Sequence, residues 1–116
     1  MPTTDELKID TKQIGGGVIV SLTGSASMEL CDQLNAALFE ACGKKPETLV
    51  VDLSRLDFIC SLGLGGLVAA YLRQQNHGGR LAVAAPNEAV LEVLNVTRLG
   101  TLLPVFKTSE AALKAK

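Results

Sequence analysis

The apolar positions of the chain follow two spacings, one typical of strands and one typical of helices. Residues 7–14 alternate apolar with polar side chains, as an edge strand does, whereas residues 49–54 begin with an unbroken apolar run that predicts a buried strand. The three glycines at residues 15–17 predict a turn after the first strand. The predicted strands are residues 7–14, 18–23, 49–54, 80–84 and 103–106.

Apolar residues three and four positions apart predict helices in the segments between and after these strands. The predicted helices run from Met28 to about Cys42, from Ser61 to about Asn76, from Pro86 to near Gly100, and from Ala111 to Ala115. Ser27 is the predicted N-cap of the first helix, and Gly43 is its predicted C′ residue. The predicted apolar face of the second helix is Leu64, Leu67, Val68, Tyr71 and Leu72, and that of the third is Val90, Leu91, Leu94 and Val96.

The order of these elements, ββαβαβαβα, predicts the α/β class. Strands that alternate with helices form a mainly parallel sheet, here of four to five strands, and the opening hairpin adds an antiparallel edge. About four helices accompany the sheet. No internal repeat or linker interrupts the pattern, so residues 1–116 are predicted to form a single domain.

Composition narrows the functional classes. Apolar residues make up 47% of the chain and the formal net charge is −1, which indicates a globular core and disfavours binding to nucleic acid through a basic face. The N-terminus has no signal-peptide pattern and no apolar run is long enough to span a bilayer, so we expect a cytoplasmic protein without membrane insertion. The three cysteines lack metal-type spacing, and no metal or cofactor is expected.

The stretch with the most specific pattern is the passage from the third strand into the second helix. Ser61 stands where the helix N-cap is predicted, next to unpaired backbone N–H groups that favour a negative charge. A phosphate on this serine would be well placed. Gly63, Gly65 and Gly66 follow it, and glycines in a helix cost stability, so they indicate either close packing or a surface approached by another chain.

The run from Asp52 to Gly65, DLSRLDFICSLGLG, resembles the signature of STAS domains. It is most similar to that of the bacterial anti-sigma factor antagonists. In that family a serine at the position of Ser61 is phosphorylated by a serine kinase that doubles as the anti-sigma factor. This chain has Cys60 where the family usually has aspartate, and Leu62 where it usually has serine.

The resemblance implies an interaction domain without enzymatic activity, which works by partner switching. Unphosphorylated at Ser61, it would bind the anti-sigma kinase; phosphorylated, it would be released. Residues 24–27 correspond to a family loop that usually carries two acids, replaced here by serines. The implied partner-binding residues are Ser25, Ser27, Cys60, Ser61, Leu62, Gly63, Leu64 and Gly65. We expect a monomer or weak dimer.

Three alternatives remain open on the sequence. Ser61 can be an ordinary N-cap, and the domain can be a constitutive scaffold that needs no phosphoserine, for example an accessory subunit of an ABC lipid-transport complex. A thiol enzyme at Cys60 is disfavoured because His77 is predicted at the far end of the same helix, several turns away. Cys31 and Cys42 are predicted to serve helix packing.

Overall fold

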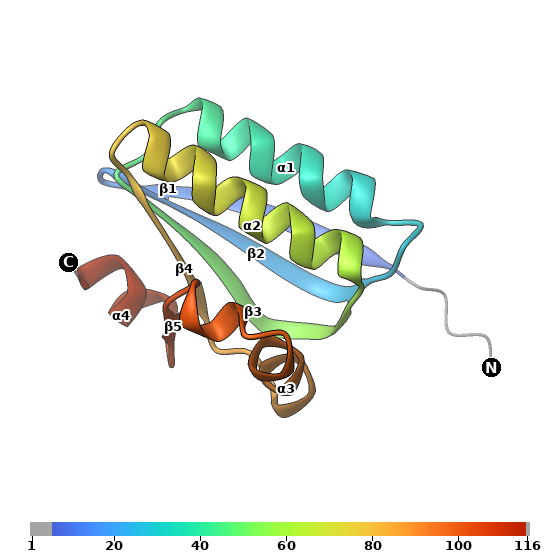
Figure 1. The fold of residues 1–116 in the computed structure, drawn as a ribbon. Helices are drawn as coiled ribbons and strands as arrows, with labels where there is room; N and C mark the ends of the chain where they lie inside the picture. The colour runs from blue at the N-terminus through green and yellow to red at the C-terminus, as the bar shows by residue number, and fades with distance from the viewer. Residues whose placement is uncertain (1–5, 116) are drawn as a thin grey trace.

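The structure, a computed structural model, describes residues 6–115 and has the predicted alternation of strands and helices (Figure 1). The elements in chain order are β1 (Leu7–Ile14), β2 (Gly17–Ala26), α1 (Cys31–Gly43), β3 (Thr48–Ile59), α2 (Ser61–Asn76), β4 (Arg80–Ala84), α3 (Glu88–Val96), the 3-10 helix η1 (Leu99–Thr101), β5 (Val105–Phe106) and α4 (Ser109–Lys114).

The described strands form one sheet in the order β1-β2-β3-β4-β5. β1 pairs with β2 in the antiparallel sense, and every other neighbouring pair is parallel. The hairpin between β1 and β2 turns at Gly15, whose φ of 58° lies in the left-handed region that glycine adopts without steric cost. The predicted fold class is therefore confirmed.

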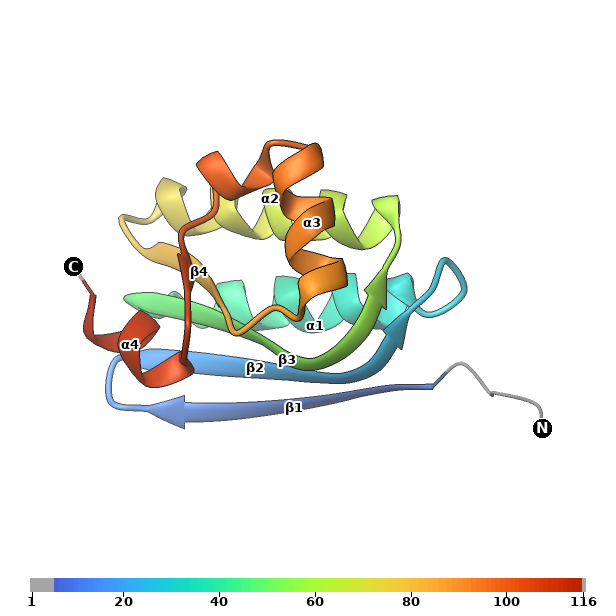
Figure 2. The ribbon, with the colours of Figure 1, turned by 90° about the horizontal axis from the view of Figure 1, so that it is seen from below.

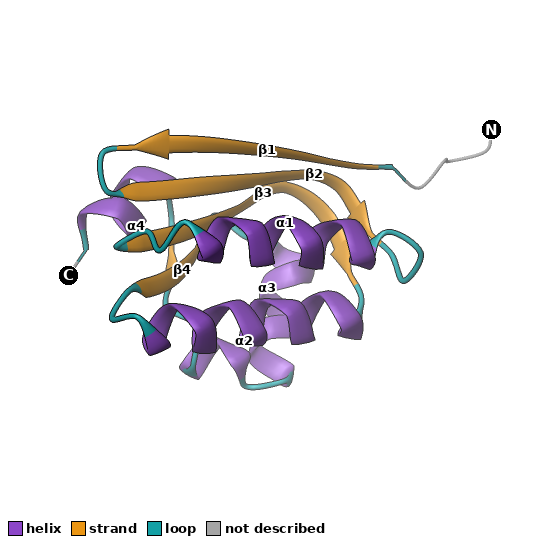
Figure 3. Cartoon of the chain, turned by 90° about the horizontal axis from the view of Figure 1, so that it is seen from above, coloured by secondary structure: helices purple, strands orange, loops and turns teal. Residues whose placement is uncertain are grey.

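The helices cover the two faces of the sheet unequally. α1 and α2 lie side by side over one face (Figures 1 and 3), where most of the buried aliphatic side chains gather. Because side chains alternate along a strand, Leu49 and Val51 of β3 point into this large core, whereas Val50 points to the other face. There it meets a smaller cluster that includes Ala112 of α4, and Figure 2 shows α4 on that side.

Strands β2 and β3 extend beyond their predicted ends. The segment after Thr23 is not a loop as predicted, because β2 continues to Ala26, and β3 continues past residue 54 to Ile59. The two strands support each other's extension: Ser25 pairs with Phe58 and Ala26 with Ile59. Pairing between neighbouring strands thus overrides the local preference of glycine and serine for a loop.

The predicted start of α1 is wrong. The helix begins at Cys31, its N-cap is Leu30, and Ser27 makes no capping hydrogen bond. Instead, the backbone carbonyl of Ser27 accepts a hydrogen bond from the Leu30 N–H (3.0 Å), which closes a turn before the helix. The Ser27 hydroxyl is turned inward and has no hydrogen-bond partner among the described residues. At the other end, Gly43 lies inside α1, and Lys45 is the residue with positive φ.

The buried faces of two helices also differ from the prediction. Leu72 of α2 is 52% exposed and Val96 of α3 is 77% exposed, although both were assigned to apolar faces. Gln74 of α2 is instead fully buried, and its Nε2 donates to the carbonyls of Pro46 (3.0 Å) and Arg80 (2.9 Å). A periodic apolar pattern cannot predict this, because the glutamine is buried for its hydrogen bonds.

Candidate functional site

The candidate site lies at the end of the molecule where β2 passes to α1 and β3 passes to α2 (Figures 1 and 3). Both connections meet there because parallel strands present their carboxyl ends at the same edge of a sheet, where binding sites of α/β folds commonly form. The Cys60 N–H donates to the carbonyl of Ala26 (2.9 Å), which joins the two connections directly.

Ser61 is exposed and is the first residue of α2, not its N-cap as predicted. The N-cap is Cys60, with φ −84° and ψ 172°, the extended conformation that this position requires, and it makes no side-chain capping bond. The correction matters for function, because a capping serine uses its hydroxyl on the backbone. The Ser61 hydroxyl has no capping role and lies at the surface beside the first-turn N–H groups.

The three glycines of α2 have different surroundings. A Cβ at Gly63 would lie 2.7 Å from Cγ1 of Ile59, and a Cβ at Gly66 would collide with the Asn35 side chain of α1. These two glycines serve close packing. Around Gly65, by contrast, a Cβ would meet no atom within 4 Å other than those of its chain neighbours and of its own helix backbone, so packing within the chain does not require glycine there.

The surface around Ser61 is hollowed and largely apolar. A shallow pocket between α1 and α2 is lined by Asn35, Ser61, Leu62, Gly65, Gly66, Ala69 and Arg73. Three large apolar side chains at this end are unusually exposed: Met28 at 63%, Phe58 at 52% and Leu62 at 49%. The sequence did not predict Met28 and Phe58 as residues of this site, because an apolar residue at the end of a strand or beside a helix is normally assigned to the core.

The residues implied by the resemblance gather at this end but point in different directions. Ser61, Leu62 and Gly65 are exposed, and Ser25 and Cys60 are half-buried. The remaining two on α2, Gly63 and Leu64, are buried against the sheet. The exposed surface at this end of the molecule is thus formed by Ser61, Leu62 and Gly65 of α2 together with the ends of β2 and β3.

Two of the three cysteines are in contact. The sulfur of Cys31, at the start of α1, lies 2.7 Å from that of Cys60 and 3.5 Å from the Ala26 carbonyl oxygen, so its single S–H can donate to either of these acceptors. Burial and the hydrogen bond with Cys60 raise the pKa of Cys31 to about 11. Burial raises the pKa of Cys60 as well, but the hydrogen bond from Cys31 and the nearby N–H groups of Gly63 and Leu62 outweigh it, and the net pKa is lowered.

No catalytic pairing of Cys60 with the histidine is formed. The only histidine of the sequence, His77, lies at the far end of α2, where its Nε2 is 2.8 Å from Oε1 of Gln74. Cys42 is buried and its sulfur donates to the Ala70 carbonyl (3.6 Å), which agrees with a packing role. Within residues 6–115, no cluster of three His, Cys, Asp or Glu side chains is arranged to hold a metal ion.

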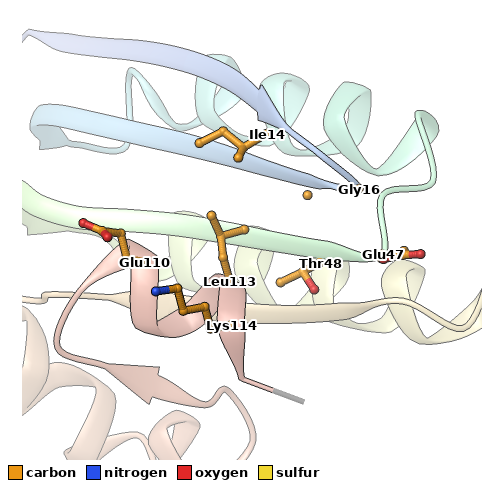
Figure 4. A pocket seen from close by; sticks show the side chains of 8 residues that line it. Ile14, Gly16, Glu47, Thr48, Glu110, Leu113 and Lys114 are labelled. Atoms are coloured by element: carbon orange, nitrogen blue, oxygen red, sulfur yellow. The ribbon is translucent and has the colours of Figure 1, made fainter.

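A second pocket lies at the opposite end, between α4 and the hairpin end of the sheet (Figure 4). Of its charged residues, Glu110 and Lys114 belong to α4 and Glu47 immediately precedes β3, and Figure 4 shows the two carboxylates far apart on opposite sides of the pocket. Converging polar groups are what fixes a ligand's orientation, and this pocket does not provide them. The Ser61 end is therefore the better candidate.

With the fold and the site established, comparison with known proteins identifies the family. The model of the family described as "Mlab, STAS domain" matches residues 9–104. The chain therefore belongs to the STAS domain family. Among the described residues, none of the helices has the length and apolar character needed to cross a membrane.

The chain is similar over almost its whole length to anti-sigma factor antagonists. BtrV of Bordetella bronchiseptica, provisionally named as one, is 34% identical over 111 residues, which cover 94% of each chain. The anti-sigma F factor antagonist of Paenibacillus polymyxa is 29% identical over 108 residues, 92% of each chain. The crystal structure of an anti-sigma factor antagonist from Mycobacterium paratuberculosis superposes with a TM-score of 0.88 at 27% identity, covering 97% of this chain and 96% of that one.

Proposed function

We propose that the protein is an anti-sigma factor antagonist that works by partner switching. In its unphosphorylated form it binds an anti-sigma factor serine kinase in the cytoplasm and so frees the sigma factor; phosphorylation of Ser61 ends the binding. The observation that carries the proposal is the position of Ser61, an exposed hydroxyl on the first turn of α2 that no capping bond occupies.

The electrostatics at the start of α2 support a switch that depends on phosphorylation of Ser61. A phosphate adds about −1.5 to −2 charges, and the N–H groups at the start of α2 tolerate that charge in the free protein. Met28, Phe58 and Leu62 supply exposed apolar surface beside it. A partner that covers this surface would strip water from the phosphate, so phosphorylation opposes the bound state far more than the free state.

The proposed partner surface combines the exposed first turn of α2 with the strand ends beside it. Leu62 and Gly65 supply an apolar side chain and an open backbone, and Ser25 and Cys60 form the half-buried floor. Ser27, Gly63 and Leu64 shape this surface from below. The kinase contact is thus expected to depend on shape and apolar area rather than on charge, since the acids usual in the family are absent from residues 24–27.

The proposal is tested by capturing partners from the native cell lysate with three baits, the wild type, Ser61→Ala and Ser61→Asp, and identifying them by mass spectrometry. We expect an ATP-binding serine kinase with the wild type and Ser61→Ala, and its loss with Ser61→Asp. Incubating the captured kinase with ATP and the wild type should phosphorylate Ser61 and release the kinase.

A matched control places the same charge elsewhere on the same helix. Gln75 is exposed and lies about 21 Å along α2 from Ser61, so Gln75→Glu should capture the kinase as the wild type does. If Ser61→Asp retains the kinase as well as Gln75→Glu does, phosphoregulation at Ser61 is wrong.

The exposed apolar side chains favour one alternative, a constitutive scaffold. Leu62, in place of the small polar residue usual in the family, enlarges the apolar surface next to Ser61, which suits a permanent interface. If the protein is a scaffold, all three baits should capture the same partner, and that partner should lack kinase motifs. That result would replace partner switching by permanent association.

A further inference from the structure

The thiols of Cys31 and Cys60 face each other at the junction of the two helix starts. Cys31 is the first residue of α1 and Cys60 immediately precedes α2, so the pair joins elements that are 29 residues apart in the chain. The separation of the two sulfurs, 2.7 Å, exceeds a disulfide bond length by only about 0.7 Å. Of the cysteines, only Cys42 lies outside this contact.

The surroundings hold both sulfurs in place. The Ala26 carbonyl accepts a hydrogen bond from the Cys60 N–H (2.9 Å) and its oxygen lies 3.5 Å from the Cys31 sulfur, so one group contacts both residues. Gly63 keeps the space open, since a Cβ there would lie 3.3 Å from the Cys31 sulfur. Cys31 is fully buried and Cys60 is half-buried, so a reagent from solvent reaches Cys60 first.

We propose that Cys31 and Cys60 form a reversible intramolecular disulfide next to Ser61. The oxidant is a low-molecular-weight disulfide of the glutathione type. Such a bond is consistent with a reducing compartment, because cytosolic disulfides, where they occur, are usually transient and redox-sensing. The proposal does not rest on the partner-switching function.

The reaction takes place in two exchange steps. The Cys60 thiolate attacks one sulfur of the disulfide RSSR, the S–S bond breaks, and one RS⁻ leaves with a mixed disulfide remaining on Cys60. Cys31 then gives up its proton to solvent and attacks the Cys60 sulfur, which expels the second RS⁻. The two protons lost by the cysteines end on the leaving groups, two electrons pass to RSSR, and the products are the protein disulfide and two RSH.

The acidities of the two thiols agree with this division of roles. Hydrogen bonds lower the pKa of Cys60, the more accessible of the two thiols and the one that attacks first, in spite of its partial burial. Burial and the negative charge that Cys60 can carry raise the pKa of Cys31. Once Cys60 is a mixed disulfide that charge is gone, so Cys31 deprotonates more readily at the step where it must attack.

Equilibration of the wild-type protein in buffers of reduced and oxidised glutathione tests the proposal. After acid quenching and alkylation, mass spectrometry of proteolytic fragments should show Cys31 linked to Cys60, with the mass of two hydrogen atoms lost and Cys42 alkylated. The oxidised monomer should unfold at a temperature higher by on the order of 10 °C, because the cross-link restricts the unfolded chain.

Matched variants sharpen the test. Cys42→Ala should oxidise as the wild type does, whereas Cys60→Ser, which replaces only the sulfur atom by oxygen, should show neither the link nor the temperature shift. The proposal is overturned if the wild type stays reduced, accumulates a glutathione adduct on Cys60 with Cys31 free, or forms a dimer linked through Cys60. These readings use the wild type alone, so they decide the question even if a variant fails to fold.

Discussion

The two ends of helix α2 are constructed differently. At its start, the N-cap makes no side-chain capping bond, glycines occupy three positions of the first two turns, and Leu62 is half-exposed. At its end, the fully buried Gln74 satisfies two backbone carbonyls and contacts His77. The end of α2 therefore stabilises the fold through satisfied hydrogen bonds, whereas its start gives up local stability.

The difference shows where the chain accepts a cost in helix stability. Each glycine in a helix interior costs roughly 1 kcal/mol relative to alanine, and an unsuitable N-cap costs about as much. Packing explains Gly63 and Gly66, because side chains there would strike Ile59 and Asn35. It does not explain Gly65, Cys60 or the exposed Leu62, and these are the residues around Ser61.

The largest expected effect on the free energy of unfolding comes from a substitution at the C-terminal end of α2. Gln74→Leu keeps the side chain's approximate size but leaves the carbonyls of Pro46 and Arg80 buried without their donor. We expect the free energy of unfolding to fall by about 3 kcal/mol, as measured by urea denaturation. Gln75→Leu, at the exposed neighbouring position, should change it by less than about 0.5 kcal/mol. Equal effects of the two substitutions would remove the contrast between the ends of α2.

A pair of glycine substitutions divides the start of the helix into packing and interface positions. Gly63→Ala should lower the free energy of unfolding by about 1 kcal/mol, because the contacts with Ile59 and Cys31 outweigh the gain in helix propensity. Gly65→Ala should raise it by up to about 1 kcal/mol, since the new methyl group meets open space.

Partner capture then tests whether Gly65 lies at an interface. If Gly65 lies at the proposed interface, Gly65→Ala should be more stable than the wild type yet bind the partner more weakly. A Gly65→Ala protein that is stabilised and binds normally would show that this glycine has no interface role.

How far the sequence predicts the molecule depends on the kind of interaction that places each residue. The strands and helices followed from apolar periodicity, and the resemblance assigned a role to Ser61 because the motif that carries it is local. The extension of β2 and β3 did not follow, since it depends on pairing between Ser25 and Phe58, which are distant in the chain. The contact of Cys31 with Cys60 was missed for the same reason: it joins two separate helix starts, and nothing local to either cysteine indicates the other.

An effect on stability of about the same size is expected from giving α2 a side-chain N-cap. Cys60 has the extended backbone of an N-cap, so the carboxylate in Cys60→Asp can accept hydrogen bonds from the N–H groups of the first turn. We expect the free energy of unfolding to rise by about 1 kcal/mol at neutral pH, with no comparable rise in Cys60→Ala. A gain in both variants would mean that removal of the thiol, rather than capping, is what stabilises the protein.

The smallest expected effect is a shift in the acidity of Cys60. Because the thiolate is the reactive form, the rate of Cys60 alkylation by iodoacetamide should rise with pH around a midpoint below the ordinary thiol value of 9.0. Cys31→Ala removes a hydrogen bond that lowers the Cys60 pKa and should move the midpoint upward, whereas Cys31→Ser keeps a donor and should move it less. If all three proteins share one midpoint, the contact between the two sulfurs does not tune Cys60, and its acidity comes from the backbone N–H groups of the uncapped helix start alone.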